Sequence, residues 1–599
     1  MPGGLLNLAA YGNLNVILNG NPSKTFFKST YAKYTNFGLQ KFRIDFEGLK
    51  TLRLNDDSVF NFNIKNYADL LMDTYFSVDI PNIYSPIYAS PDLDLDISYV
   101  QPYEFKWIEN LGFNLIRNVR LMIDGLVIQE FTGQYLYNMI QRDFSEEKKK
   151  LVDEMTGNTA EFNDPANYSN RNGNYPSASN NNFSVNDWED GPEPSIRGRK
   201  IFIPLNFFST LISTAALPLI ALEYNKVYVE VTCRPINELF VIRDISWLND
   251  AALQNINDTS NSVPWKIPYN YSYYNPPYIA PDFNNPAYQM FYFLQQPPYN
   301  QYYITGTSAD ISNTTGAYLN IKNNWEQNIN LICTYAFLDD QERQIFAGQE
   351  QSYLIKQVHE KTIYNVLGTQ RAQIENIGLV VSWMWNFQRT DVKLRNEWTN
   401  YSNWEYKNMP YPCVLTYDLS QSIPNAYPPE YPTPSLFNTQ THNYNQLFIT
   451  GPFHIENAKN IMTAWGLLID GKVRETTFDA DIVNYTEKYM KTVGNAKSGI
   501  YSYNFCLTTD PFSIQPTGAI NLSKFTNIEF EYSTIQPYDL SYINYQQTLI
   551  PPCDDGIGNI LGVENPNVLD YLYRYNLHIM QEKYNLLIFK NGMAKLLFS

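Results

Sequence analysis

The chain has four histidines, and their spacing does not predict a metal site. They are His359, His442, His454 and His578. A zinc-protease helix carries His-Glu followed by a second His three residues after the Glu. His359-Glu360 is followed at that place by Ile363. We therefore expect no metal and no cofactor, and we interpret the histidines as structural residues.

Two further patterns approach known binding loops without completing them. Asp92-Leu93-Asp94-Leu95-Asp96 is similar to the start of a calcium loop, but Ile97 and Tyr103 stand where the loop requires Gly and Glu. The stretch from Gly556 to Gly562 departs by one residue from the dinucleotide-binding spacing of glycines. No GxSxG nucleophile motif occurs. These patterns predict a strand and a loop in a chain that is not an enzyme.

Two groups of side chains have chemistry that suits carbohydrate. Asn-x-Ser/Thr sequons, the acceptors of N-linked sugar, occur at Asn167, Asn182, Asn257, Asn270, Asn313 and Asn400. They are candidate glycosylation sites, although an Asn-rich chain produces many by chance. Trp398, Trp404 and Tyr406 have flat faces that stack on sugar rings, so a carbohydrate-active β-sandwich enzyme is one alternative. That enzyme requires two carboxylates about 5–10 Å apart in a cleft.

Charge and cysteine usage restrict the partners and the compartment. The 599 residues include 43 basic and 60 acidic side chains, for a net charge of −17. We see no basic stripe with interleaved aromatic residues, so direct nucleic-acid binding is not expected. The five cysteines are widely spaced without a CxxC: Cys233, Cys333, Cys413, Cys506 and Cys553. They predict free buried thiols in a protein made in a reducing compartment.

The most apolar run, from Leu211 to Leu222, is short and contains Ser213, Thr214 and Pro218. It is too short to span a bilayer, and no signal peptide is visible at the N-terminus. We therefore expect a soluble protein synthesised in the cytosol.

The elements that position these residues are predicted to be strands. Phe and Tyr are plentiful, and residues such as Phe60, Phe62 and Ile64 alternate with polar neighbours. Asp124-Gly125 and Asp470-Gly471 each lie between two apolar strands and predict tight hairpins of the type I′ class. The alternating strand 227–233 has a counterpart at 528–532 in the second half. Two similar sets of parts in the same order indicate that one β domain was duplicated.

The predicted organisation has four parts. Residues 1–24 form an apolar N-terminal arm without a core of its own, and 25–235 form a first β domain. Residues 236–326, rich in Pro, Asn and Tyr, form a linker and insertion, and 327–599 form a second β domain.

Short motifs in both halves resemble one family, the major capsid proteins of nucleocytoplasmic large DNA viruses. They include Ala10-Tyr11-Gly12, Phe131-Thr132-Gly133-Gln134-Tyr135, Ile203-Pro204-Leu205, Gln515-Pro516-Thr517-Gly518 and Tyr584-Asn585-Leu586-Leu587. The resemblance implies an all-β fold of two tandem eight-stranded antiparallel jelly rolls, a double jelly roll, with long loops and a few short helices.

The resemblance also implies a function. A homotrimer would form a pseudo-hexagonal capsomer that tiles the icosahedral shell of a large double-stranded DNA virus, assembled in the host cytoplasm. Its partners would be neighbouring capsomers and, through the N-terminal arm, minor capsid proteins and the inner membrane side of the virion. A double jelly-roll scaffold protein that shapes a viral membrane during assembly is the alternative within the same fold. The virus, the host and the shell size do not follow from the residues.

Overall fold

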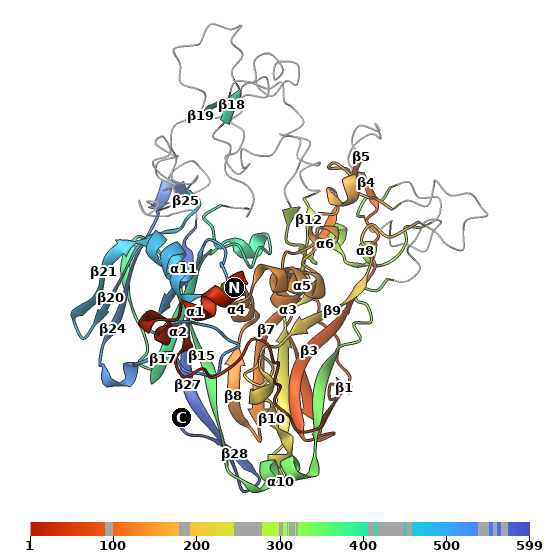
Figure 1. Ribbon diagram of the computed structural model, residues 1–599. Helices are drawn as coiled ribbons and strands as arrows, with labels where there is room; N and C mark the ends of the chain where they lie inside the picture. Colours follow the sequence, from red (N-terminus) through yellow and green to blue (C-terminus); the bar gives the residue numbers. More distant parts are fainter. Residues whose placement is uncertain are drawn as a thin grey trace.

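The computed structural model describes residues 2–89, 100–178, 192–244, 278–298, 303–307, 310, 318, 321–404, 406, 414–416, 448–450, 458–536, 550–554, 560–564 and 573–598. Within these residues the chain folds into two antiparallel β-sandwiches that stand side by side (Figure 1).

The first sandwich, roll 1, consists of two sheets. One sheet contains β1 (Phe37–Asp45), β14 (Asn330–Leu338) and β3 (Leu70–Ile80), and both β9 (Arg199–Pro204) and β10 (Leu217–Pro218) pair with β3. The other has the order β2 (Ser58–Ile64), β11 (Val227–Cys233), β7 (Ile116–Ile123) and β8 (Leu126–Phe131). Apolar and polar residues alternate along β11 and give it one fully buried face, as period-two patterning dictates.

The second sandwich, roll 2, repeats this plan. Its first sheet has the order β15 (Gln351–Val366), β27 (Tyr575–Lys590), β17 (Leu379–Arg389) and β22 (Ile500–Asn504), with β23 (Ile520–Asn521) on β17 and β28 (Met593–Leu596) on β27. Its second sheet has the order β16 (Thr369–Gln373), β24 (Ile528–Thr534), β20 (Met462–Ile469) and β21 (Lys472–Asp479). Each of these strands except β28 occupies the place of a strand in roll 1, so the predicted duplication and the double jelly roll are confirmed.

Both Asp-Gly hairpins adopt the predicted geometry. The φ angles are 50° and 83° at Asp124 and Gly125, and 48° and 73° at Asp470 and Gly471. Two successive positive φ angles define the type I′ turn, whose twist matches that of the flanking strands. The hairpins β7–β8 and β20–β21 therefore mark equivalent places in the two rolls.

The strand expected to open the second domain belongs to roll 1 instead. β14 pairs with β1 from Phe37↔Leu338 to Asp45↔Asn330, and on its other side it pairs with β3. It is the counterpart of β27, the strand that completes roll 2. Part of the predicted linker also packs on roll 1, because β12 (Phe240–Arg243) pairs with β6 (Phe105–Trp107) and shares the hydrophobic core of roll 1. The boundary predicted near residue 327 was wrong for 330–338, because a long insertion precedes the last strand of roll 1.

Short helices cover the edges and ends of the rolls. They are α3 (Leu111–Leu115), α4 (Gly133–Asp143), α5 (Glu146–Thr156), α6 (Ala160–Asn163), α8 (Phe291–Leu294), α10 (Asp340–Gly348) and α11 (Glu487–Lys491), which continues the π-helical turn η13 (Ile482–Thr486). The remaining strands are β4 (Ile87–Ala89), β5 (Val100–Pro102), β13 (Tyr278–Ile279), β18 (Val414–Thr416), β19 (Phe448–Thr450), β25 (Ile550–Asp554) and β26 (Ile560–Glu564). In the described part of the chain, no helix is both long and apolar enough to cross a membrane.

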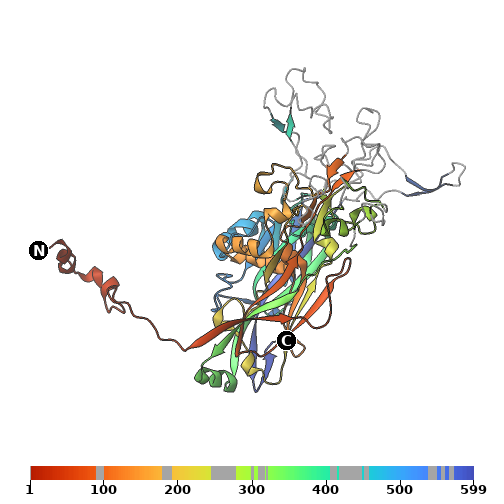
Figure 2. The same cartoon turned by 90° about the vertical axis from the view of Figure 1, so that its right-hand side faces the viewer.

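The N-terminal arm stands apart from both rolls. It contains α1 (Gly3–Ala9), η1 (Asn13–Asn15) and α2 (Val16–Asn19), and none of these helices has a buried residue. Figure 2 shows the arm extending away from the body of the molecule. Its exposed apolar residues include Leu8, Leu14, Ile17 and Leu18.

Candidate assembly site

Roll 1 and roll 2 meet edge to edge along β8 and β15. The side-chain amide of Gln129 on β8 donates a hydrogen bond of 2.6 Å to the backbone oxygen of Lys356 on β15. In return, Gln357 on β15 donates one of 2.6 Å to the backbone oxygen of Ile128 on β8. Each edge strand has backbone groups without a partner in its own sheet, and these two amides satisfy one on each side.

Helix α4, which directly follows β8, attaches roll 1 to the outer face of roll 2. Thr132 accepts a hydrogen bond from the Tyr135 backbone and so caps the start of the helix. Tyr135 donates to Glu582 on β27 at 2.8 Å, and Asn138 donates to Asn386 on β17 at 3.1 Å. Arg142 lies on the same side of the helix, because positions three, four and seven residues apart share a face.

Arg142 joins two carboxylates inside this junction. Its guanidinium lies 2.6 Å from Asp143 and 2.8 Å from Glu582, and all three side chains are buried. Burial by itself would lower the pKa of Arg142, but Asp143 and Glu582 raise it above its ordinary value. Burial opposes ionisation of Glu582 as well, and Arg142 nonetheless lowers the pKa of that carboxyl. Burial raises the pKa of Asp143, against the effect of Arg142. Arg142 and Glu582 therefore form a buried ion pair in which each partner depends on the other.

A third carboxylate at the junction has no ion pair with a cation among the described residues. Glu360 on β15 accepts hydrogen bonds of 2.8 Å from the backbone nitrogen and from the hydroxyl of Thr132. Burial raises the pKa of Glu360 to about 7, against the effect of these two donors. An ionised Glu360 costs more in the folded chain than in the unfolded one. Its contribution to stability is consequently present at acidic pH and declines as the pH rises toward 7.

The contact inside the chain leaves two sheet edges at opposite sides of the molecule. Roll 1 uses β8 and roll 2 uses β15, whereas β1 of roll 1 and β21 of roll 2 are end strands with no further described strand beside them. In Figure 1, β1 and β21 lie at the two lateral margins of the body. Most residues of both strands are exposed.

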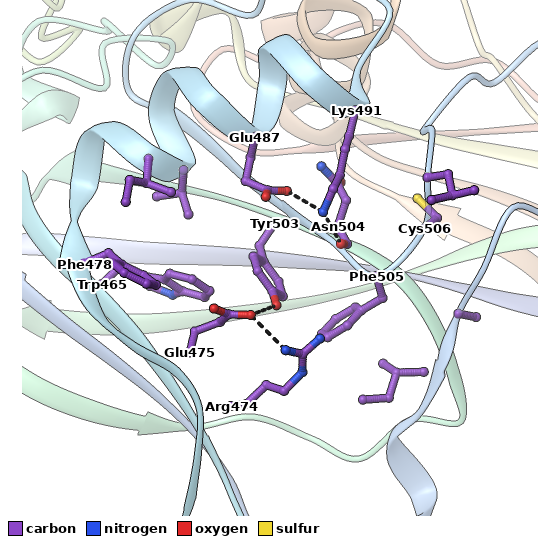
Figure 3. A pocket seen from close by; sticks show the side chains of 15 residues that line it. Trp465, Arg474, Glu475, Phe478, Glu487, Lys491, Tyr503, Asn504, Phe505 and Cys506 are labelled. Atoms are coloured by element: carbon purple, nitrogen blue, oxygen red, sulfur yellow. Dashed lines mark hydrogen bonds and ion pairs between the residues drawn. The ribbon is translucent and has the colours of Figure 1, made fainter.

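A pocket of about 480 Å³ lies beside the free β21 edge (Figure 3). Glu487 and Lys491 line it from the helix and form an ion pair of 3.1 Å. Glu475 lines it from β21, where it accepts from Arg474 at 2.9 Å and from the Tyr503 hydroxyl at 2.6 Å. Both carboxylates of the pocket thus have a charged partner, an arrangement that stabilises structure and leaves neither as a free acid or base.

The aromatic residues predicted to stack on sugar are half-buried and contact other protein groups. Arg234 lies 4.3 Å from the ring centroid of Trp398, and Lys459 lies 5.2 Å from that of Trp404. The Tyr406 hydroxyl donates to the backbone of Tyr278. These cations lie over faces of the Trp398 and Trp404 rings that a sugar would need.

The candidate glycosylation sites have different surroundings. Asn167 is exposed, and its amide donates to Asp164. Asn400 is buried, and its amide donates to Glu397 and to the backbone of Trp404. A sugar on Asn400 would require these bonds to break, so the structure does not favour that site. Asn182, Asn257, Asn270 and Asn313 lie outside the described residues.

No group of three or more potential metal ligands occurs in the described part of the chain. The ring nitrogen of His578 hydrogen-bonds to Thr362, and burial lowers the pKa of His578 to about 4. Cys233, Cys333 and Cys506 are free and buried. The Asp92–Asp96 stretch, His442, His454 and Cys413 lie outside the described residues.

The buried charges at the roll junction gave no signal in the sequence, although Thr132 and Tyr135 beside them belong to one of the motifs of the resemblance. Arg142 and Glu582 are 440 positions apart, and neither belongs to a recognisable motif. Arg142 follows the first Asp-Gly hairpin closely in the chain, but nothing in the sequence identifies its partner.

Comparisons with known proteins agree with this architecture. Residues 25–274 match the family model described as "Major capsid protein N-terminus". The chain is 22% identical over 561 residues to probable capsid protein 4 of Acanthamoeba polyphaga mimivirus. The alignment covers 89% of this chain and 92% of that protein. This chain is also 30% identical over 241 residues to the major capsid protein of Phaeocystis pouchetii virus. That alignment covers 40% of this chain and 42% of the relative. Capsid protein 1 of mimivirus is likewise matched over 36% of its length.

Solved structures share the whole fold. The Faustovirus major capsid protein superposes with a TM-score of 0.55 at 11% identity, covering 98% of this chain and 96% of that one. A chain of the quasi-atomic model of the PBCV-1 virus capsid superposes with a TM-score of 0.52 at 16% identity, covering 96% and 100%. With the paired rolls, the family match over residues 25–274 and these likenesses together, the chain is similar to the major capsid proteins of nucleocytoplasmic large DNA viruses and has their double jelly-roll fold.

Proposed function

We propose that this chain is a major capsid protein whose homotrimer forms a pseudo-hexagonal capsomer. Capsomers of this kind would tile the icosahedral shell of a large double-stranded DNA virus. The coarser part of the proposal, a capsid role, is supported by the family match and by the relatives named capsid proteins.

The observation that carries the trimer is the polarity of the contact between the rolls. Roll 1 contributes its β8 edge and roll 2 contributes its β15 edge, so the contact is head to tail. A head-to-tail contact leaves one unused edge of each kind, β21 and β1. Heterologous contacts of this type close into a ring when the rotation between units permits. Three chains supply six similar rolls, which match a six-sided tile.

The other parts of the proposal concern placement in the virion. The exposed arm at residues 1–24 would face inward, toward minor capsid proteins and the inner membrane side. Assembly would occur in the host cytoplasm. The chain is proposed to be a structural protein and not an enzyme. Its relatives are named capsid proteins, and the carboxylates of the pocket beside β21 are in ion pairs.

Light scattering of the purified full chain tests the trimer. We expect a mass three times that of one chain, unchanged on moderate dilution. A species that remains a monomer at high concentration would contradict the capsomer.

Mass spectrometry of purified virions separates the capsid from the membrane-shaping scaffold. A capsid protein is expected among the abundant proteins of mature particles. Its absence from them, together with its presence in assembling cells, would favour the scaffold.

A further inference from the structure

The first 36 residues differ in charge from the rest of the chain. Residues 1–23 contain no charged side chain, although charged residues make up 17% of the whole sequence. Residues 24–36 contain Lys24, Lys28 and Lys33 and no acidic residue. We call residues 24–36 the basic stem, and residues 3–19, which contain α1, η1 and α2, the helical tip. The stem is therefore positive on a protein whose net charge is −17.

The helical tip is apolar on all sides. Asn7 is the only polar side chain in α1, and none of the residues of α1, η1 and α2 is buried. A helix without a polar face is stable where its surroundings are apolar. The tip lacks such surroundings in this structure. Its side chains that are more than half exposed include Leu6, Leu8, Leu14, Ile17 and Leu18.

The basic stem alternates lysines with exposed aromatic rings. Phe26 and Phe27 are 86% and 99% exposed, and the ammonium of Lys24 lies 4.9 Å from the ring centroid of Phe26. Tyr31 and Tyr34 are exposed to a similar extent. At a membrane surface, aromatic rings lie at the level of the headgroups and lysines extend their ammonium groups toward the lipid phosphates. An apolar tip followed by an aromatic and basic stem has the order of the layers of a bilayer, from acyl chains to headgroups.

We propose that the helical tip binds in the surface of an anionic lipid bilayer, with the lysines of the basic stem against the headgroups. The tip would lie in the plane of the surface, because no helix among the described residues is long and apolar enough to cross a membrane. This inference rests on the inward placement of the arm in the proposed function, and it names the class of partner that the arm would meet there.

The length of the arm lets the acidic body stay away from an anionic surface. Residues 21–36 contain neither helix nor strand, and the body begins at Phe37, which pairs with Leu338. Figure 2 shows the arm extending away from the body. Sixteen residues can span up to about 50 Å, whereas salt screens exposed charges beyond about 8 Å at physiological ionic strength. Repulsion between the body and the bilayer therefore does not oppose binding of the tip.

Other partners suit the arm less well. A helix that docks in a protein groove has an apolar face and an opposite face for water, and α1 has no such polar face. Nucleic acid would attract Lys24, Lys28 and Lys33 but would leave the apolar tip exposed to water. A bilayer with anionic headgroups accounts for both the tip and the stem.

Flotation of the full chain with vesicles tests the charge of the partner. We expect binding to phosphatidylcholine vesicles that contain phosphatidylserine, and much weaker binding to phosphatidylcholine alone. Substituting Lys24, Lys28 and Lys33 together by Gln should weaken binding to the anionic vesicles by about 100-fold, because each lysine near such a surface contributes about fivefold.

The matched control removes the same charge from the body. Lys65, Lys150 and Lys226 are exposed on roll 1, and substituting all three by Gln gives the same net charge as the stem variant. This control is expected to bind anionic vesicles as the parent chain does. A control that loses as much binding as the stem variant would overturn the role of the stem.

A second pair of variants tests the apolar tip. Substituting Leu14, Ile17 and Leu18 together by Ser should abolish binding to both kinds of vesicle, because the tip would lose its contact with the acyl chains. Its control is the triple Ser variant of leucines exposed on the body, at Leu49, Leu394 and Leu507, which should bind as the parent does. The tip variant should also keep the parent's unfolding midpoint, since α2 buries nothing.

Hydrogen exchange locates the contact without any substitution. We expect amides of residues 3–19 to exchange more slowly when anionic vesicles are added, while those of the two rolls are unchanged. Protection of the rolls without protection of the tip would overturn the assignment.

The outcomes distinguish this inference from the proposed function. A trimeric parent chain that binds neither kind of vesicle overturns the inference and leaves the capsomer intact. A parent chain that binds DNA through the stem but binds no vesicles assigns the lysines to nucleic acid and likewise overturns it. A monomeric parent chain whose tip binds anionic vesicles contradicts the capsomer and supports the lipid contact.

Discussion

Arg142 has a structural role that depends on two carboxylates from different parts of the chain. Asp143 is its neighbour in the sequence, whereas Glu582 belongs to the strand that completes roll 2. All three side chains are buried, so water cannot solvate the charge that remains when a partner is removed. The same group of residues therefore holds α4 to roll 2 and makes the relative placement of the two rolls specific.

Replacing Arg142 by Met should destabilise the chain by about 3–5 kcal/mol, because Asp143 and Glu582 would then be buried without their cation. Unfolding in urea measures this loss as a lower midpoint. The matched control is Arg371→Met, since Arg371 pairs with Glu529 and Glu531 but is 56% exposed. The control should cost less than about 1 kcal/mol. Equal shifts for the two variants would show that the buried cluster contributes no more than a surface pair.

At the scale of the element, the two hairpins direct the chain into the helices that follow them. Each hairpin is a type I′ turn, and each is followed within two residues by a helix that packs on its own roll. The turn sets the register of β7 with β8 and of β20 with β21. That register in turn determines which side of the following helix points away from its own roll. In roll 1, this is the side of α4 that contacts roll 2.

Substituting Gly471 by Ala should lower the stability of roll 2 by about 1 kcal/mol, because a side chain is strained at a φ of 73°. There is open space around the position, so no clash adds to this cost. Thermal unfolding measures the change. Gly348→Ala is the control: Gly348 also has open space but lies at the end of α10 without a positive φ, so its substitution should be neutral or slightly stabilising. If both variants unfold at the same temperature, the turn geometry has no measurable energetic role.

At the scale of the molecule, one chain contains a complete roll-to-roll contact and leaves β1 and β21 as end strands with no further described strand beside them. The body can fold without the N-terminal arm, since α1 and α2 bury nothing against it. The arm has more exposed apolar residues than a solvated tail requires, and we expect it to function only in the assembled shell.

Deletion of residues 2–24 should leave the trimer intact and reduce shell assembly. Light scattering measures the trimer, and electron microscopy of assembly reactions measures the shells. Replacing the same residues by a Gly/Ser segment of equal length is the control for length, and it should reproduce the assembly defect because the apolar side chains are lost. A deletion that dissolves the trimer would instead identify the arm as an element between subunits.

Much of the fold could be predicted from neighbouring residues. The Asp-Gly pairs determine their own turns because only a few residues tolerate two positive φ angles in succession. Alternation along 227–233 and 528–532 determines which faces are buried, because the strand pleat has a period of two. The repeated order of these parts then identified the duplication, and resemblance in short motifs identified the family.

Other features were decided only by tertiary structure. Strand 330–338 has the composition of any buried strand, and its place between β1 and β3 depends on pairing across some 290 residues. The Asn400 sequon is indistinguishable from the exposed one at Asn167 until the fold buries its side chain. Arg142 meets Glu582 across 440 positions of the chain. Sequence patterns determine local conformation, because turns and strands depend on neighbouring residues. Burial of a side chain and its bonding partner depend on which distant segments pack against it.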